Sequence, residues 1–164
     1  IITFGPAKIH TDFGIAHDLI IPALEADGTT PLAEALDLAL EHLRNRKKIY
    51  RQHGIPYYRP WFMLITDGEP NCKEKASAAG KRIREAEDNR ELSFYTIGVD
   101  GADMAFLKTL APDKRPPIKL KELRFKDLFL WLSASTTSVS NSRGALDKIV
   151  MPPIGWGEMD LDAA

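Results

Sequence analysis

Two near-continuous apolar runs, separated by a segment with helical periodicity, constrain the fold of this chain more than any other feature. The runs are Trp61–Thr66 (WFMLIT) and Leu92–Val99 (LSFYTIGV), and the helical segment between them is Lys75–Asp88. Apolar runs without polar alternation are typical of parallel strands that are covered on both faces. A strand, a helix and a second strand in this order therefore predict a parallel sheet.

The same alternation continues on both sides of this unit. Further short strands are predicted at 1–4, 7–13 and 117–120, and further helices at 31–46, 104–110 and 125–139. We therefore predict an α/β fold, in which a doubly wound, mainly parallel sheet is flanked by helices. Residues 1–140 form the predicted domain. Residues 141–164 are rich in Ser, Gly and Pro and form a predicted C-terminal tail, which either packs on the surface or is loosely ordered.

The composition excludes several classes of function. The formal net charge of -1 gives no electrostatic reason for binding nucleic acid or an anionic membrane. The single cysteine, Cys72, excludes an internal disulfide framework and a metal site built from several cysteines. No apolar run approaches the ~18–20 residues of a membrane span. We therefore expect neither nucleic acid nor membrane among the partners.

The end of the first apolar run carries the most informative polar residues. Strand 61–66 is followed by Asp67-Gly68-Glu69-Pro70, and ligands of open α/β sheets gather at the carboxyl ends of strands. The Asp67 carboxylate, together with the hydroxyl of Thr30 on another loop, suits a hard cation such as Mg²⁺. A second interpretation is that Asp67 and Gly68 only form a turn in which Asp67 accepts local amides. Both interpretations remain open at this point.

The start of the helix at 31–46 is also marked. Thr30 is predicted to cap this helix, with Pro31 at its first position and Glu34 in its first turn.

Several segments, taken in order, resemble a known family. They are ITFG, DGTTPLAEALDLALEHL, YYRPWFMLITDGEPN, FYTIGV with GADMAFLKTL, and FKDLFLWLSASTTSVS. Their order and spacing resemble bacterial von Willebrand factor A (VWA) domains, and most of all the stand-alone cytosolic branch associated with tellurite and stress resistance. The resemblance implies a doubly wound sheet with one antiparallel edge strand, a non-enzymatic protein-binding function and a cytoplasmic location.

The family resemblance also implies a metal-ion-dependent adhesion site. In the family, an Asp-x-Ser-x-Ser motif, a Thr and an Asp hold Mg²⁺ or Mn²⁺, and an acidic residue of the partner protein completes the coordination. By position, Thr30 matches the family Thr and Asp67 the family Asp, which can act through a coordinating water. The neighbouring Gly28, Thr29, Gly68 and Glu69 are then expected to contact the partner.

The chain departs from the family pattern in one respect. No Asp-x-Ser-x-Ser motif is present, and the first residues match the end of the family's second strand. In the family, a strand and a helix precede the segment that matches residue 1. The resemblance therefore implies either that the parent polypeptide extends upstream of Ile1 or that the chain is truncated. The central family strand would lie between the strands ending at Phe4 and Thr66. In residues 1–164 alone, we expect this slot to be empty, refilled by another molecule or closed by re-pairing, and we expect weak metal binding.

Two functions of other classes remain as alternatives. A Mg²⁺-dependent phosphohydrolase would use Asp67 or Asp27, because DGTTP superficially resembles the motif of haloacid-dehalogenase-type phosphatases. That motif needs its Asp at the end of an apolar strand with a second Asp two residues away, and neither residue meets this condition. A nucleotide-binding domain ranks last, because the sequence has no Gly-rich phosphate loop.

Overall fold

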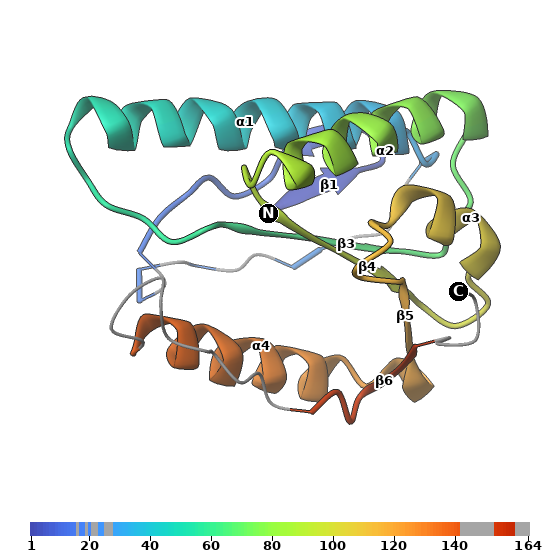
Figure 1. Ribbon diagram of the computed structural model, residues 1–164. Helices are drawn as coiled ribbons and strands as arrows, with labels where there is room; N and C mark the ends of the chain where they lie inside the picture. Colours follow the sequence, from blue (N-terminus) through green and yellow to red (C-terminus); the bar gives the residue numbers. More distant parts are fainter. Residues whose placement is uncertain (16, 19, 21–22, 25–27, 142–152, 160–164) are drawn as a thin grey trace.

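The computed structural model describes residues 1–15, 17, 18, 20, 23, 24, 28–141 and 153–159 (Figure 1). The strands are β1 (Ile2–Phe4), β2 (Ala7–Ile9), β3 (Trp61–Thr66), β4 (Ser93–Gly98), β5 (Ile118–Leu120) and β6 (Gly157–Met159). The helices are α1 (Leu32–Gln52), α2 (Lys73–Asp88), α3 (Met104–Leu110), the 3₁₀ turn η1 (Lys121–Leu123) and α4 (Phe125–Ser140).

The main sheet has the order β3-β4-β5-β6. Strands β3 and β4 pair in parallel along their whole length, from Trp61 opposite Ser93 to Thr66 opposite Gly98. Strand β5 continues the parallel pairing, and β6 runs antiparallel at the edge. The predicted α/β fold with a mainly parallel sheet is therefore confirmed, and so are its two core strands.

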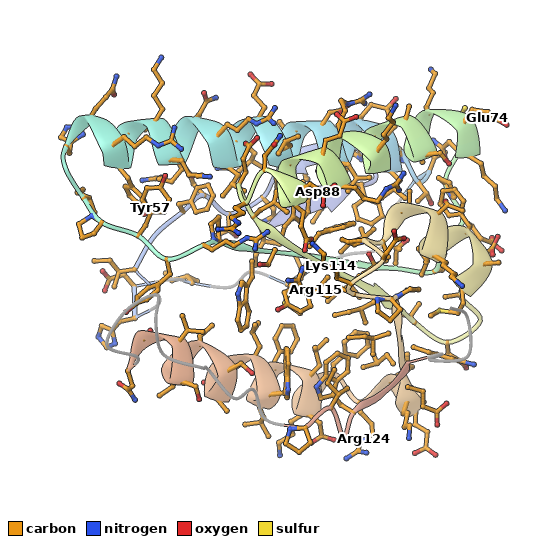
Figure 2. The ribbon with its side chains drawn as sticks, in the orientation of Figure 1. Tyr57, Glu74, Asp88, Lys114, Arg115 and Arg124 are labelled. Carbon is orange, nitrogen blue, oxygen red and sulfur yellow. The ribbon has the colours of Figure 1, made fainter. Side chains whose placement is uncertain are left out.

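Helices cover both faces of this sheet, with α1 and α2 side by side on one face and α4 on the other (Figure 1). The side chains between these layers are drawn in Figure 2. The core under α1, α2 and α3, called the upper core here, includes Leu32, Leu36, Leu40, Leu64, Ile83, Phe94, Leu107 and Leu110. The core over α4, called the lower core, includes Ile97, Ile118, Leu120, Leu128, Trp131 and Trp156.

Strands β1 and β2 form a separate antiparallel hairpin. Among the described residues, no backbone pairing joins this hairpin to the four-stranded sheet. The hairpin lies against α1, and Phe4 packs on the upper core. The slot expected between the strands ending at Phe4 and Thr66 is therefore not closed by re-pairing of β1 with β3.

Two segments differ from their predicted bounds. Helix α1 ends at Gln52 rather than at residue 46, because tertiary contacts hold its basic end. The buried Lys47 ammonium donates to the Glu91 carbonyl at 2.8 Å, and Arg44 forms two hydrogen bonds with the Glu91 carboxylate. Strand β2, in contrast, stops at Ile9 and does not reach the predicted residue 13.

Part of the predicted tail packs on the domain. Trp156 is 2% exposed in the lower core, and its carbonyl accepts the Lys121 amide at 3.0 Å. The Arg124 guanidinium, labelled in Figure 2, donates to the Gly155 carbonyl at 3.0 Å. Residues 142–152 and 160–164 lie outside the described residues. Within the described ranges, no helix combines the length and apolarity needed to cross a membrane.

Candidate partner-binding site

Asp67 lies directly after β3, at the carboxyl end of the sheet. Its Oδ1 accepts two hydrogen bonds that form the turn after the strand. This oxygen accepts the Glu69 amide at 3.1 Å and the Thr66 hydroxyl at 3.4 Å. The Asp67 carbonyl accepts the Asp103 amide at 2.9 Å. The turn interpretation of Asp67 is therefore correct for Oδ1. In the described structure Oδ2 has no hydrogen-bond partner and is free to meet a ligand.

Gly68 is required by the close approach of the loop before α3. Its φ is +76°, and a Cβ there would lie 3.1 Å from the Asp103 carbonyl oxygen and 3.2 Å from the Leu107 Cγ. L side chains adopt this backbone region only at a cost of ~1–2 kcal/mol. The turn after β3 is thus packed directly against the start of α3.

Asp103 fixes that neighbouring loop. Its carboxylate caps α3 by accepting the Phe106 amide at 2.9 Å, and it pairs with the Lys73 ammonium at 2.7 Å. The hydrogen bond from Lys73, followed by the Phe106 amide, lowers the pKa of Asp103. Hydrogen bonding to Asp103 in turn raises the pKa of Lys73. The start of α2 and the start of α3 are therefore tied together beside Asp67.

Thr30 joins the site through its backbone. The Thr30 amide donates to the Asn71 side-chain oxygen at 2.7 Å, and the Asn71 amide donates to the Thr30 carbonyl at 3.0 Å. The prediction that Thr30 caps α1 is wrong, because α1 begins at Leu32 after Pro31 and has no side-chain cap. The Thr30 backbone is engaged by Asn71 instead. Its hydroxyl has no hydrogen-bond partner in the described part of the chain.

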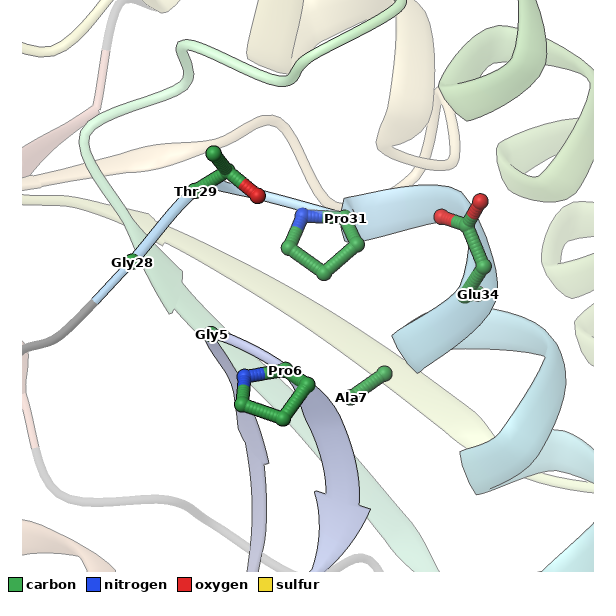
Figure 3. A pocket seen from close by; sticks show the side chains of 7 residues that line it. All are labelled: Gly5, Pro6, Ala7, Gly28, Thr29, Pro31 and Glu34. Atoms are coloured by element: carbon green, nitrogen blue, oxygen red, sulfur yellow. The ribbon is translucent and has the colours of Figure 1, made fainter.

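A pocket of about 630 Å³ opens between the loop 28–31 and the β1–β2 turn (Figure 3). Its lining residues are Gly5, Pro6, Ala7, Gly28, Thr29, Pro31 and Glu34. Gly28 has a φ of +78°, and a Cβ there would lie 3.3 Å from the Gly5 carbonyl oxygen. The loop 28–31 therefore touches the β1–β2 turn on one side and the loop 67–71 on the other.

The structure thus joins the loops of the predicted site residues, although no hydrogen bond among the described residues links Thr30 directly to Asp67. Gly68 and Glu69 form the turn after Asp67, while Gly28 and Thr29 border the pocket. The sequence predicts neither the hydrogen bonds by which Asn71 links the two loops nor the Lys73–Asp103 pair. The only signal for Asn71 was its place in TDGEPN, since Asn is common in turns.

The described residues do not form a complete metal site. None of their His, Cys, Asp and Glu side chains gather in a group of three or more that could hold a metal ion. The predicted ligands Thr30 and Asp67 supply one hydroxyl and one carboxylate, whereas Mg²⁺ demands near-octahedral coordination by oxygen. Asp27, the other residue considered for phosphate chemistry, lies outside the described residues.

Comparison with known proteins supports the resemblance to VWA domains at the level of the family. Among the solved structures similar to this chain is the manganese-loaded Plasmodium vivax TRAP protein, with 26% identity and a TM-score of 0.40. The match covers 54% of this chain but only 31% of that chain. No curated protein matches the sequence. The profile of the von Willebrand factor type A domain matches residues 17–128, which is more than half of the 164 residues. This chain belongs to the von Willebrand factor type A family.

Proposed function

We propose that this chain is a non-enzymatic protein-binding module whose partner contacts the loops 28–31 and 67–71. VWA domains are a type of protein-interaction module, and the family assignment is the basis of the proposal. The observation that carries it is the pair of hydrogen bonds between Thr30 and Asn71. Because these bonds hold two loops 41 residues apart in one arrangement, the loops present a single preformed surface.

The polar groups left available on this surface support a partner with an acidic group. The Thr30 hydroxyl is a donor to which a carboxylate can bind, whereas the amides of Thr30, Gly68, Glu69 and Asn71 are already engaged within the two loops. In the family, Mg²⁺ or Mn²⁺ strengthens such contacts. Since the described residues supply only Thr30 and Asp67, we propose that metal contributes here only where further oxygen ligands complete the set.

The cellular setting of the proposal rests on the sequence resemblance alone. Segments such as TPLAEALDLALEHL and ITDGEPN resemble the stand-alone bacterial branch linked to tellurite and stress resistance. We therefore propose a cytoplasmic role in a bacterial stress response.

Quantitative cross-linking to the immobilised chain in a bacterial extract tests the surface. Thr30→Ala and Asp67→Ala are each expected to reduce capture of the same partner severalfold. The matched controls are Thr136→Ala on α4 and Asp88→Ala on α2, both exposed and remote in sequence from the two loops (Asp88 is labelled in Figure 2). Capture that is equal for the loop variants and the controls would contradict the proposed surface.

A phosphate-release assay tests the proposal that the chain is not an enzyme. We expect no release from small phosphate esters above the level of a buffer blank, with or without Mg²⁺. Release that disappears in Asp67→Ala would establish the phosphohydrolase alternative instead.

A further inference from the structure

The outward face of α4 carries almost no charge, although α4 is a surface helix. It lies on the face of the sheet opposite α1 and α2 (Figure 1). Its exposed residues are Lys126, Phe129, Leu130, Ser133, Ala134, Thr136, Thr137 and Ser140. Lys126 is the only charged residue among them, and no charged residue follows it up to the end of the helix.

Helix α2 provides the contrast within the same chain. It has 16 residues, as α4 has, and all of its exposed residues except Ala78 are charged. Charged and polar side chains on the outer face are typical of a helix that meets water there. The outer face of α4 therefore differs from that of a helix built only for solvent.

Two large apolar side chains lie at the centre of this face. Phe129 is 56% exposed and Leu130 is 58% exposed, whereas Leu128 and Trp131 of the same helix fill the lower core. Ser133 and Ala134 follow Phe129 and Leu130 at the spacing that places side chains next to one another on a helix. Phe129 and Leu130 therefore form one continuous stripe with the small residues of the next turn.

The hydroxyl groups beyond that turn bond within the helix. The Thr136 hydroxyl donates to the Ser133 carbonyl at 2.9 Å, and the Thr137 hydroxyl donates to the same carbonyl at 2.9 Å. The Ser138 hydroxyl donates to the Ala134 carbonyl at 3.0 Å. Because these protons are already used, covering the face with an apolar partner leaves none of the three donors unsatisfied.

The stripe is complementary to itself in shape. Its first half carries the bulky Phe129 and Leu130, and its second half carries the small Ser133 and Ala134. When two such helices lie antiparallel across a two-fold axis, the bulky half of each meets the small half of the other. A two-fold interface uses the same patch on both subunits, so such complementarity within one patch favours a second copy.

We propose that a second copy of this chain docks on this face, with the two α4 helices packed antiparallel. Phe129 of each copy then packs on Ala134 of the other, and Leu130 packs on Ser133. A charged partner fits less well, because its charge would be buried against a face that offers no opposite charge. The uncharged stripe also brings no like charges together when it meets its own copy.

Analytical ultracentrifugation of the full chain over a dilution series tests the dimer. Since one helix from each copy forms a small interface, we expect a dissociation constant of about 10–100 µM. Phe129→Glu should raise this constant at least about tenfold, because each copy would bury a carboxylate against an apolar surface. The matched control is Ala78→Glu on α2, which should change the constant by less than about twofold. Far-UV circular dichroism should be the same for all three proteins.

Mixing two variants tests the antiparallel arrangement. Phe129→Glu and Ala134→Lys should each be monomeric alone, whereas their mixture should form a heterodimer, because Glu at 129 of one copy meets Lys at 134 of the other. The control mixture of Phe129→Glu with Ala134→Glu should stay monomeric.

Three results would overturn the proposal. They are a dimer that persists in Phe129→Glu, a mixture with Ala134→Lys that does not reassemble, and a wild-type chain that stays monomeric up to about 1 mM. In the last case, binding of phosphatidylcholine vesicles that is lost in Phe129→Glu would identify a lipid surface as the occupant instead. The loops 28–31 and 67–71 take no part in this test, so its failure would leave the proposed function unchanged.

Discussion

Two hydrogen bonds join Thr30 and Asn71: the Thr30 amide donates to the Asn71 side-chain oxygen at 2.7 Å, and the Asn71 amide donates to the Thr30 carbonyl at 3.0 Å. This contact unites a loop before α1 with a loop after β3. It makes Asn71 the residue on which the geometry of the proposed surface depends.

Replacing Asn71 should loosen that surface. Asn71→Ala removes the acceptor of the Thr30 amide, so we expect the free energy of unfolding to fall by about 1 kcal/mol. Urea unfolding measures this change, and partner capture should weaken as in Thr30→Ala. Asn45→Ala, on the exposed face of α1, is the control and should change stability by less than about 0.5 kcal/mol. Equal stability of the two variants would show that the contact contributes nothing.

Comparing Gly68→Ala with Gly101→Ala separates the steric cost of a Cβ at Gly68 from the cost of the positive φ that both positions share. Their φ angles are +76° and +78°, but a Cβ at Gly101 meets nothing within 4 Å, whereas one at Gly68 meets Asp103 and Leu107. Both alanine variants carry the backbone cost of ~1–2 kcal/mol. Gly68→Ala should lose about 1–3 kcal/mol more because of crowding. Similar losses in urea unfolding would contradict the tight packing after Asp67.

The Lys73–Asp103 pair predicts a pH dependence. The hydrogen bond from Lys73 lowers the pKa of Asp103 in the folded state, below the unfolded value of about 3.9. Asp103 therefore stabilises the fold above about pH 4, and this contribution is lost as the pH falls through the folded pKa. Asp103→Asn can still cap α3 but does not titrate.

Urea unfolding between about pH 7 and about pH 3 compares the two proteins. The stability of the wild type should fall more steeply in acid than that of Asp103→Asn. Asp100→Asn, at an exposed loop position, should follow the wild type. If the free energy of unfolding varied with pH in the same way for the wild type and Asp103→Asn, the Lys73–Asp103 pair would not contribute to the pH dependence of stability.

The elements predicted best are those that local pattern determines. Trp61–Thr66 was predicted correctly as a strand, because its first five residues are all apolar, show no helical periodicity and are followed at once by a turn signal. The prediction that Thr30 caps a helix was wrong, because Asn71, which binds the Thr30 backbone, is 41 residues away and no local pattern indicates this contact. Strand β6 was not predicted, because Gly157–Met159 has no strand pattern and, among the described residues, it pairs with β5 alone.

Metal titration tests the central claim most directly, namely that the proposed surface is built from loops and lacks a complete metal site of its own. Calorimetry of the full chain with Mg²⁺ and with Mn²⁺ should show only weak binding, unchanged in Asp67→Ala, because Thr30 and Asp67 alone cannot satisfy octahedral coordination. Tight one-to-one binding that is lost in Asp67→Ala would contradict the account, since it would mean that this chain completes the site without the Asp-x-Ser-x-Ser ligands.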